Sequence, residues 1–240
     1  MKTLPLECYY IIFYNLHHDY KNLFSCALVN RHWCRVIIPI LWSKPNLKDM
    51  RLIRIFLLTL NVNEQALLVP FKITLPDHPK PLFEYTNYIT SINSYYLHYG
   101  VKFWLACGGF EMRKLDKIPH ELENAIESSL VTMLLRTSKN LKSLHLNEII
   151  CNQLIFENLH ENTTVTSMNL GKISDDFKSK AIDLLVKILY TKSTLTSLNF
   201  GSNKLEPGEM KMILEVLYKN TTLNSLNFNS SQILVLERKE

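Results

Sequence analysis

An eleven-residue stretch that occurs twice constrains the fold of this chain more than any other feature. STLTSLNFGSN, residues 193–203, returns as TTLNSLNFNSS, residues 221–231, so the second copy starts 28 residues after the first. A repeat of this kind is typical of stacked architectures, in which each unit buries its apolar face only against the next unit. Enzyme active sites seldom repeat in this way, so the feature favours a structural or binding role.

The repeat extends to four units when the chain is aligned on the pattern L-x-x-L-x-L. The units start at Leu141, Val165, Leu195 and Leu223, at intervals of 24, 30 and 28 residues. Alternate side chains of a strand point to the same side. The pattern therefore predicts a short strand in each unit, with its apolar residues facing inward.

Amphipathic helices are predicted ahead of the first strand and between the later ones. Residues 119–140, 174–192 and 206–220 each carry apolar side chains at helical spacing. Ser174 is a candidate N-cap, and Pro207 stands near the first helical position, where proline is common. The side chains expected to face inward are Leu122, Ile126, Leu130, Met133, Phe177, Ala181, Leu184, Ile188, Met210, Leu214 and Leu217.

A strand, a turn and a helix at this period resemble the leucine-rich repeat, in the longer helix-bearing form found in ribonuclease inhibitor. The resemblance covers residues 119–240 and implies a solenoid with a parallel sheet on its concave side and helices outside. The asparagine that the family carries after the strand is present only as Asn203, with Ile173 and Ser231 at the aligned positions. We therefore expect an irregular arc. The tail at 233–240 either covers the end of the solenoid or leaves an edge for a partner.

Small polar side chains would form columns on the concave face. The candidate substrate-facing residues are Ser167, Asn169, Ser197, Asn199, Ser225 and Asn227. These columns lack the aromatic or charged anchors that usually dominate binding hot spots. Two interpretations stay open: the columns contact a target, or they only hydrogen-bond to one another along the sheet, which the missing anchors favour.

Three short helices are predicted in the first 44 residues. Pro5 begins the first helix, which runs to Leu16, while Asp19 and Asn30 are the N-caps of the second and third. Pro39 bends or ends the third helix. Apolar residues lie on several sides of these helices, and so short a segment forms too small a core to cover them. The surplus implies a partner or a neighbouring domain.

The same segment resembles the F-box. The matching pieces are Leu4-Pro5-Leu6-Glu7, then Ile12-Phe13 with Leu16, then Leu28-Val29-Asn30-Arg31-His32-Trp33, and finally Leu41-Trp42. Their order and spacing carry the likeness over residues 4–44, although Asn30 replaces the cysteine that usually stands at this position. An F-box docks on Skp1 and, through it, on a cullin-RING ubiquitin ligase, while the rest of the chain holds a protein substrate.

The F-box resemblance also implies roles for individual residues. The residues at or near the Skp1 surface would be Leu4, Pro5, Ile12, Leu16, Leu23 and Val29. The residues in the core of the F-box would be Phe13, Trp33, Leu41 and Trp42. Two alternatives remain: the helices are a cap that packs its surplus apolar surface on the C-terminal domain, or the protein is a scaffold that binds Skp1 without ubiquitin transfer.

The predicted fold class is therefore α plus α/β. It combines an F-box at 1–44, a helical and irregular region at 45–118 that packs on the repeats, and leucine-rich repeats at 119–240. In the middle region, the tyrosine-rich segment 84–105 is interpreted as a helix packed on the first repeat. A base-stacking surface is the less favoured alternative, because Lys102 is the only cation among its aromatic residues. One further helix face is expected from Met50, Ile53, Leu57 and Leu60.

Motifs and charge argue against catalysis and nucleic-acid binding. The 27 basic and 22 acidic residues give a net charge of +5, far from the clustered basic stripe of a nucleic-acid binder. The five cysteines form no CxxC pair, so neither a zinc site nor a disulfide framework is indicated. HExxH, GxSxG and GxxxxGK motifs are all missing from the sequence. We expect a non-catalytic adaptor without a cofactor or a metal.

The sequence also argues against a signal peptide and a membrane span. Glu7 precedes the first apolar run and no cleavage site follows it, which argues against a signal peptide. The apolar runs are far shorter than the roughly 20 residues that a membrane span needs. The sequons at Asn162, Asn220 and Asn229 are attributed to turn chemistry. These features favour a cytoplasmic or nuclear protein without a membrane partner.

Overall fold

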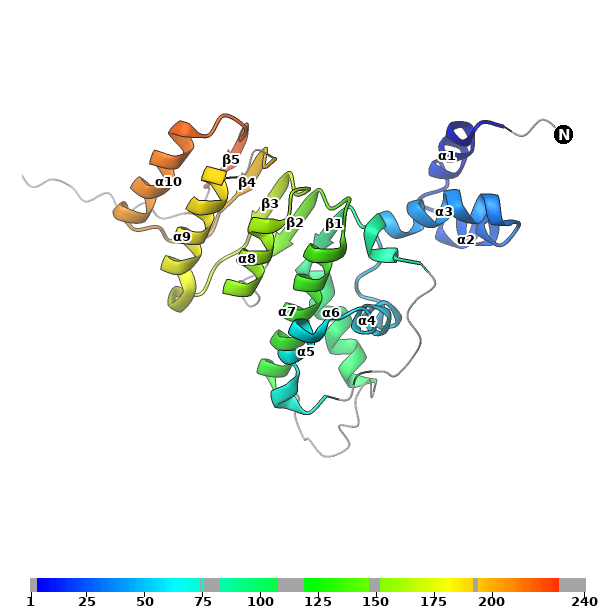
Figure 1. Ribbon diagram of the computed structural model, residues 1–240, viewed down its shortest axis with the longest axis horizontal. Helices are drawn as coiled ribbons and strands as arrows, with labels where there is room; N and C mark the ends of the chain where they lie inside the picture. The colour runs from blue at the N-terminus through cyan, green and yellow to red at the C-terminus, as the bar shows by residue number, and fades with distance from the viewer. Residues whose placement is uncertain are drawn as a thin grey trace, which may run out of the picture.

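The computed structural model describes residues 4–73, 75, 83–107, 119–146, 152–191 and 194–228. In this part of the chain it shows a mixed α/β architecture with ten α-helices and one sheet of five parallel strands. The predicted combination of helices and a parallel sheet is confirmed. Figure 1 shows three N-terminal helices standing apart from a body formed by the sheet and the other helices. The tail at 233–240 and the sequon at Asn229 lie outside the described residues.

The N-terminal bundle consists of α1 (Leu6–Tyr14), α2 (Tyr20–Ala27) and α3 (Arg31–Ser43). Asp19 accepts a hydrogen bond from the backbone N–H of Asn22 at 3.1 Å, and Asn30 accepts one from Trp33 at 2.9 Å. Both predicted N-caps are confirmed. Pro39 lies inside α3 and does not end it.

The core of the bundle is small. Phe13 and Trp33 meet edge to face with their ring centroids 5.0 Å apart, and Leu41 packs partly buried against the same cluster. Trp42 does not belong to this core. It stacks on Tyr85 at 4.2 Å and packs against the core of the body, so its predicted place in the bundle core is wrong. The fully buried side chains of the bundle are Phe13, Leu23, Ala27, Val36, Ile37 and Ile40.

The sheet contains β1 (Ser91–Asn93), β2 (Ser143–Leu146), β3 (Ser167–Leu170), β4 (Ser197–Asn199) and β5 (Ser225–Asn227), side by side in chain order. The register places Ser143 opposite Ser167, Ser167 opposite Ser197, and Ser197 opposite Ser225. The four strands predicted from the repeat are therefore present, and equivalent positions of the units lie side by side.

β1 corrects the interpretation of residues 84–105 as one helix. Ser91 pairs with Ser143 and Asn93 with His145, which extends the sheet by a strand that the L-x-x-L-x-L alignment does not predict. Helix α6 (Ser94–Ala106) begins directly after this strand, and the 3-10 helix η2 (Tyr85–Tyr88) precedes it.

The later strands are connected through α7 (His120–Thr137), α8 (Gln153–Glu161), α9 (Asp175–Thr191) and α10 (Pro207–Lys219), which form a row along the sheet (Figure 1). The four residues predicted to face inward from α7 are all buried, as are Ala181 and Ile188 of α9. In α10 the prediction for Leu214 is wrong, because its side chain is 53% exposed while Ile213 is fully buried.

The remaining helices join the sheet in one core. α4 (Met50–Leu57) packs against α6, and α5 (Val62–Ala66) packs against α7, with the 3-10 helix η1 (Val69–Phe71) following α5. A continuous cluster of 39 buried apolar side chains runs from Leu47 to Ile213 within the described residues. The middle region and the repeat units therefore share this core. None of the helices described combines the length and the apolar composition needed to cross a membrane.

Two of the sequon asparagines hold the turns that lead into strands. Asn162 donates to the carbonyl of Leu135 at 3.0 Å and accepts from the N–H of Val165 at 3.0 Å. Asn220 donates to the carbonyl of Leu189 at 2.7 Å in the same way. Their assignment to turn chemistry is confirmed.

Candidate docking surfaces

The bundle exposes a large apolar area, which we call the bundle surface. Each of its ten large apolar side chains exposes between 46% and 71% of its area. These ten are almost half of the 21 exposed large apolar side chains in the described part of the chain, although they lie within 26 residues. The bundle surface consists of Leu4, Leu6, Tyr10, Ile11, Ile12, Tyr14, Tyr20, Phe24, Leu28 and Val29.

Helix α1 explains much of this exposure. It is apolar on several sides but packs mainly against α3, so Phe13 is its one fully buried residue. On its open side Tyr10 and Tyr14 stack on each other with ring centroids 5.7 Å apart. Between α1 and α3 runs an apolar groove of about 640 Å³, lined in part by Leu6 and Ile11. A helix that is apolar all round needs cover on every side, and the bundle supplies it on one.

Most of the predicted Skp1-facing residues lie on or beside the bundle surface. Leu4, Pro5, Ile12 and Val29 are exposed, and Leu16 is half-buried. Leu23 is fully buried in the bundle core and cannot reach a partner, so its predicted role is corrected to a core residue. The sequence argument missed the other exposed residues of the surface. The spacing of four between Leu6, Tyr10 and Tyr14 is the signal that could have identified the open side of α1.

The outward positions of the strands form a second candidate surface, the strand face. The six predicted substrate-facing residues lie on β3, β4 and β5 in matching register. Their side chains are half-buried, apart from the exposed Ser225, and alternate with buried apolar residues on β3 and β4. β1 adds Ser91 and Asn93 to the same columns. The strand face is polar and formally uncharged, and partial burial lowers the pKa of His145 on β2, which favours its neutral form.

An open groove lies where the strand face meets the bundle. It has a volume of about 940 Å³, and we call it the junction groove. Ser91 and Asn93 of β1 line it, so the groove is continuous with the strand face. Its other lining residues are Tyr20, Leu41, Trp42, Lys44, Pro45, Asn46, Leu47, Lys48, Asp49, Leu52 and Tyr96.

The charges of the junction groove are unequal. The ammonium group of Lys48 lies 4.8 Å from the ring centroid of Tyr96 and 5.7 Å from that of Tyr99. Asp49 is the one carboxylate among the lining residues, and the guanidinium of Arg51 binds it at 2.6 Å. Hydrogen bonds from Arg51 lower the pKa of Asp49, against a smaller opposing effect of burial.

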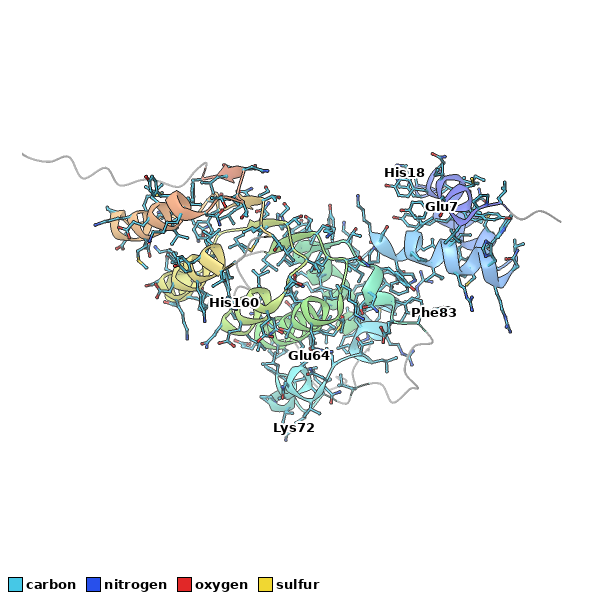
Figure 2. All side chains as sticks on the ribbon, turned by 45° about the horizontal axis from the view of Figure 1, so that its top comes forward. Glu7, His18, Glu64, Lys72, Phe83 and His160 are labelled. Carbon is cyan, nitrogen blue, oxygen red and sulfur yellow. The ribbon has the colours of Figure 1, made fainter. Side chains whose placement is uncertain are left out.

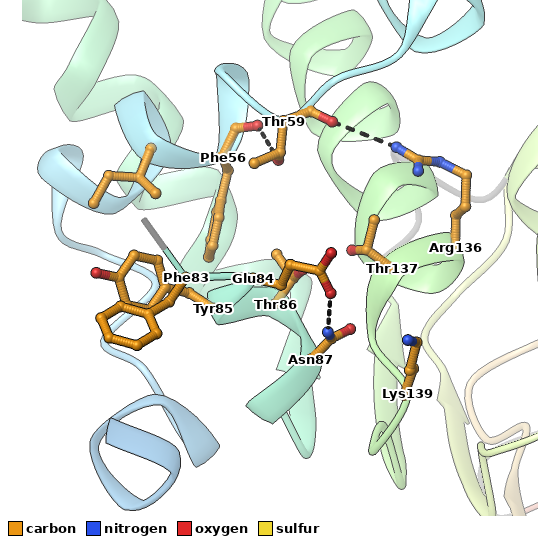
Figure 3. Close-up of a pocket in the computed structure, with 11 residues that line it drawn as sticks. Phe56, Thr59, Phe83, Glu84, Tyr85, Thr86, Asn87, Arg136, Thr137 and Lys139 are labelled. Carbon is orange, nitrogen blue, oxygen red and sulfur yellow. Dashed lines mark hydrogen bonds between the residues drawn. The ribbon is translucent and has the colours of Figure 1, made fainter. Parts of the chain in front are cut away.

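A smaller pocket of about 340 Å³ lies between η2 and the end of α7 (Figure 3). Arg136 at its rim is bound by the buried carboxylate of Glu64 at 2.7 and 2.9 Å and donates a long bond of 3.4 Å to the carbonyl of Thr59. Across the pocket, Asn87 donates to the carboxylate of Glu84 at 2.5 Å. Arg136 thus links α7 to α5, and the bond between Asn87 and Glu84 lies within η2 and its N-cap, which indicates a structural role for these polar groups.

Buried ionisable residues between α6 and α7 also serve the interior. His98 bonds the buried carboxylate of Glu127 at 2.5 Å, and Glu123 lies 3.3 Å from His120 and 3.8 Å from Lys102. Burial raises the pKa of Glu127, and the bond from His98 opposes that shift. This cluster is separate from the residues that form the bundle surface or line the junction groove.

The two candidate surfaces occupy different parts of the molecule. Figure 2 shows Glu7 and His18 on the bundle, well away from Glu64, Lys72 and His160 on the body. The rings of His17 and His18 lie against each other with centroids 3.6 Å apart at the end of α1. The chain therefore presents an apolar surface at one end and a polar strand face beyond it. Comparison of the chain with models of known protein families, with curated proteins and with solved structures found no match.

Proposed function

We propose that this protein is a substrate-recognition adaptor of a Skp1–cullin–F-box type ubiquitin ligase. In this proposal the bundle is an F-box that docks on a Skp1-like adaptor through the bundle surface. The repeat units are leucine-rich repeats whose strand face holds a protein substrate. The protein is itself non-catalytic and acts within the cell.

The exposure of the bundle surface is the observation that carries the proposal. Ten exposed large apolar side chains within 26 residues are typical of an interaction site on a soluble protein. The alternative, in which the bundle covers its surplus by packing on the rest of the chain, finds little support. The bundle core and the body core are separate clusters. The described contacts between the two parts lie at the end of α3, where Trp42 stacks on Tyr85 of η2 and Ser43 accepts from Thr90. The ten residues remain exposed beside the described body.

The body supports the second half of the proposal. Five parallel strands in chain order, with helices along the sheet, agree with a leucine-rich repeat arrangement. Asn203 is fully buried, accepts from the N–H of Ile173 at 2.8 Å and donates to the carbonyl of Phe200 at 3.1 Å. It thus links the loops after β3 and β4, which is the role expected of the family's asparagine.

The proposed mechanism is positioning. An adaptor that holds a substrate beside a ubiquitin-charged enzyme raises the effective concentration of the substrate's lysines near the reactive thioester. The chain needs no catalytic side chain for this. It needs two surfaces held at a fixed separation, and the hydrogen bonds from Thr90 to the carbonyl of Ser43, at 2.9 Å from both the amide and the hydroxyl, tie the end of α3 to the start of β1.

The test is capture of Skp1 and a cullin by the full-length protein. Replacing Leu4 and Ile12 by aspartate places two charges in the proposed interface. At about 2 kcal/mol or more for each buried charge, capture should weaken by roughly a thousandfold. The matched control replaces Val62 and Val69, which are 81% and 70% exposed on the body, by aspartate.

Three outcomes are distinguishable. Loss of both proteins in the first variant, with both retained in the control, supports the adaptor function. Undiminished capture by the Leu4→Asp, Ile12→Asp variant contradicts it. Capture of Skp1 without a cullin by the unmodified protein would instead identify a scaffold that binds Skp1 outside the ligase.

A further inference from the structure

We infer that the junction groove binds an acidic, extended segment of the target protein, and that this segment continues over the strand face. This inference rests on the proposal that the strand face holds a protein substrate, and it adds the chemical class of that substrate. In this inference, the lysines of the groove provide a charged anchor at the end of the strand face. The serine and asparagine columns of the strand face carry no charge.

The groove lies at the first strand of the sheet, where an extended chain can be accommodated. Its floor is β1, whose outward residues Ser91 and Asn93 begin the two polar columns, and one wall is the segment 44–49. Ser43, just before this segment, accepts from the N–H of Thr90 at 2.9 Å, so the wall runs beside the edge of the sheet. A peptide that lies in the groove can continue over β2 and the later strands, where serine and asparagine side chains offer hydrogen bonds.

The positive charge of the groove favours a peptide that carries carboxylates. Lys44 and Lys48 are both exposed at its rim. The rings of Tyr96 and Tyr99 hold Lys48 by cation–π contacts, which position its charge without neutralising it. Asp49 is already bound by Arg51. The uncompensated charge at the groove is therefore positive, and it complements carboxylates on a partner.

Other anionic partners fit less well. A nucleic acid would need a row of cations that follows its phosphates, and the groove supplies two lysines. A phosphate is usually held by the forked donors of arginine, and Arg51 is committed to Asp49. The apolar side chains of Leu41, Trp42 and Leu52 beside the lysines fit a peptide in which acidic and apolar residues are mixed.

The test selects ligands without assuming a sequence. The full-length protein, immobilised through a fused soluble tag, is used to select from a phage library of random twelve-residue peptides, with the tag alone as background. The selected peptides are synthesised with a fluorescein label, and their affinity is measured by anisotropy. We expect enrichment of Asp and Glu over the unselected library, and binding that weakens as the salt concentration rises.

The variants locate the binding site. Replacing Lys44 and Lys48 by glutamate should weaken binding by about tenfold or more, because two attractive charges become repulsive. Lys187→Glu with Lys219→Glu makes the same change in net charge on α9 and α10, at the far end of the row of helices, and should alter affinity less than about twofold. Asn93→Asp is a gentler second variant. It adds a negative charge to the floor while keeping the side-chain oxygen that accepts from the N–H of Tyr95 at 3.0 Å, and it should also weaken binding.

The results separate this inference from the proposed function. If the selected peptides are not enriched in acidic residues, or bind the groove variants as tightly as the unmodified protein, the inference is overturned. Because capture of Skp1 uses the bundle surface, it is measured independently on the same variants. Skp1 capture without acidic selection removes only the inference, whereas acidic selection without Skp1 capture removes the ligase function.

Discussion

The bundle and the body differ in how much of their apolar surface they bury. The bundle buries six apolar side chains and leaves ten large ones exposed, whereas the described body buries 39 in one continuous cluster. Both regions are built from helices with similar caps, so local structure does not cause the difference. It arises because three short helices enclose little volume, while each strand and helix of the body covers its neighbour.

This difference suggests that the body provides most of the stability of the chain, whereas the bundle provides a surface for binding. The body has a core large enough to hold its fold without help, and its strand face is polar. The bundle has little stability of its own and would gain it from a partner, because binding to the folded form stabilises that form by mass action. The region that contributes least to the stability of the free chain is therefore the region most suited to dock on another protein.

The largest expected effect comes from removing a core residue of the bundle. Phe13 is 3% exposed and meets Trp33 edge to face, so Phe13→Ala should destabilise the bundle by about 3–5 kcal/mol. A loss of this size is comparable to the whole stability that so small a core supplies. Hydrogen exchange measured by mass spectrometry should show loss of protection throughout α1–α3 while the body stays protected.

The control for this experiment lies one residue away. Tyr14 is 46% exposed, and Tyr14→Ala should leave exchange in the bundle nearly unchanged. If Phe13→Ala also removed protection from the strands, the two regions would fold as one unit. The contrast between a bundle and a body with separate cores would then not extend to their stability.

Smaller effects on the free energy of unfolding are expected when two glycines in helices of the body are replaced by alanine. A Cβ atom on Gly100 of α6 would lie 2.1 Å from the carbonyl oxygen of Leu47 and 3.1 Å from Ile53, so the helix and the wall of the junction groove touch through this glycine. Gly100→Ala should therefore destabilise the body by about 1–3 kcal/mol, despite the better helix propensity of alanine.

Gly208 of α10 provides the matched substitution. A Cβ atom there would meet nothing within 4 Å, so Gly208→Ala should stabilise the protein by up to about 1 kcal/mol through helix propensity alone. Urea unfolding of the two variants measures both effects. Equal effects at the two positions would show that α6 does not approach the segment 44–49 as closely as described.

The sequence predicts local features well because they depend on near neighbours. The alternation in L-x-x-L-x-L sets which side chains are buried, and it predicts four strands and their register. The caps Asp19 and Asn30 follow from their position before apolar runs. β1 was missed because Ser94 replaces the apolar residue at the last position of the pattern. The shared signature of Thr90-Ser91-Ile92-Asn93 with Thr166-Ser167-Met168-Asn169 could have revealed it.

Features that depend on distant residues could not be predicted. Nothing near Trp42 in the sequence shows that it stacks on Tyr85, and the likeness to an F-box placed it in the wrong core. The burial of Leu23 beside the exposed Phe24 depends on how α3 crosses α2. The junction groove brings Tyr20 and residues 41–52 together with residues 91–96, and the position of the Lys48 charge over Tyr96 depends on this packing.

The smallest expected effect depends on pH and belongs to the body alone. Glu127 is fully buried, burial raises its pKa, and the bond from His98 offsets part of that rise. The neighbouring charges are Glu123, which acts in the same direction as burial, and Lys102, which opposes it. A folded-state pKa above the unfolded value means that the folded protein holds the proton more tightly. The contribution of Glu127 is thus fully present below the ordinary glutamate pKa of about 4.3 and is lost as the pH rises through the raised value.

The Glu127→Gln variant keeps a polar side chain beside His98, but its amide cannot ionise. Urea unfolding at several pH values should therefore show that the stability of the unmodified protein falls relative to that of the variant as the pH rises from about 4.3 towards neutrality. Glu121→Gln, on the exposed side of the same helix, should leave the profile of the unmodified protein unchanged. Parallel profiles for the unmodified protein and Glu127→Gln would mean that His98 fully compensates the buried charge.

Hydrogen exchange in the bundle should not follow this pH dependence, because Glu127 lies in the body, between α6 and α7. A pH response shared by both regions would show that they are energetically coupled, which their separate cores argue against.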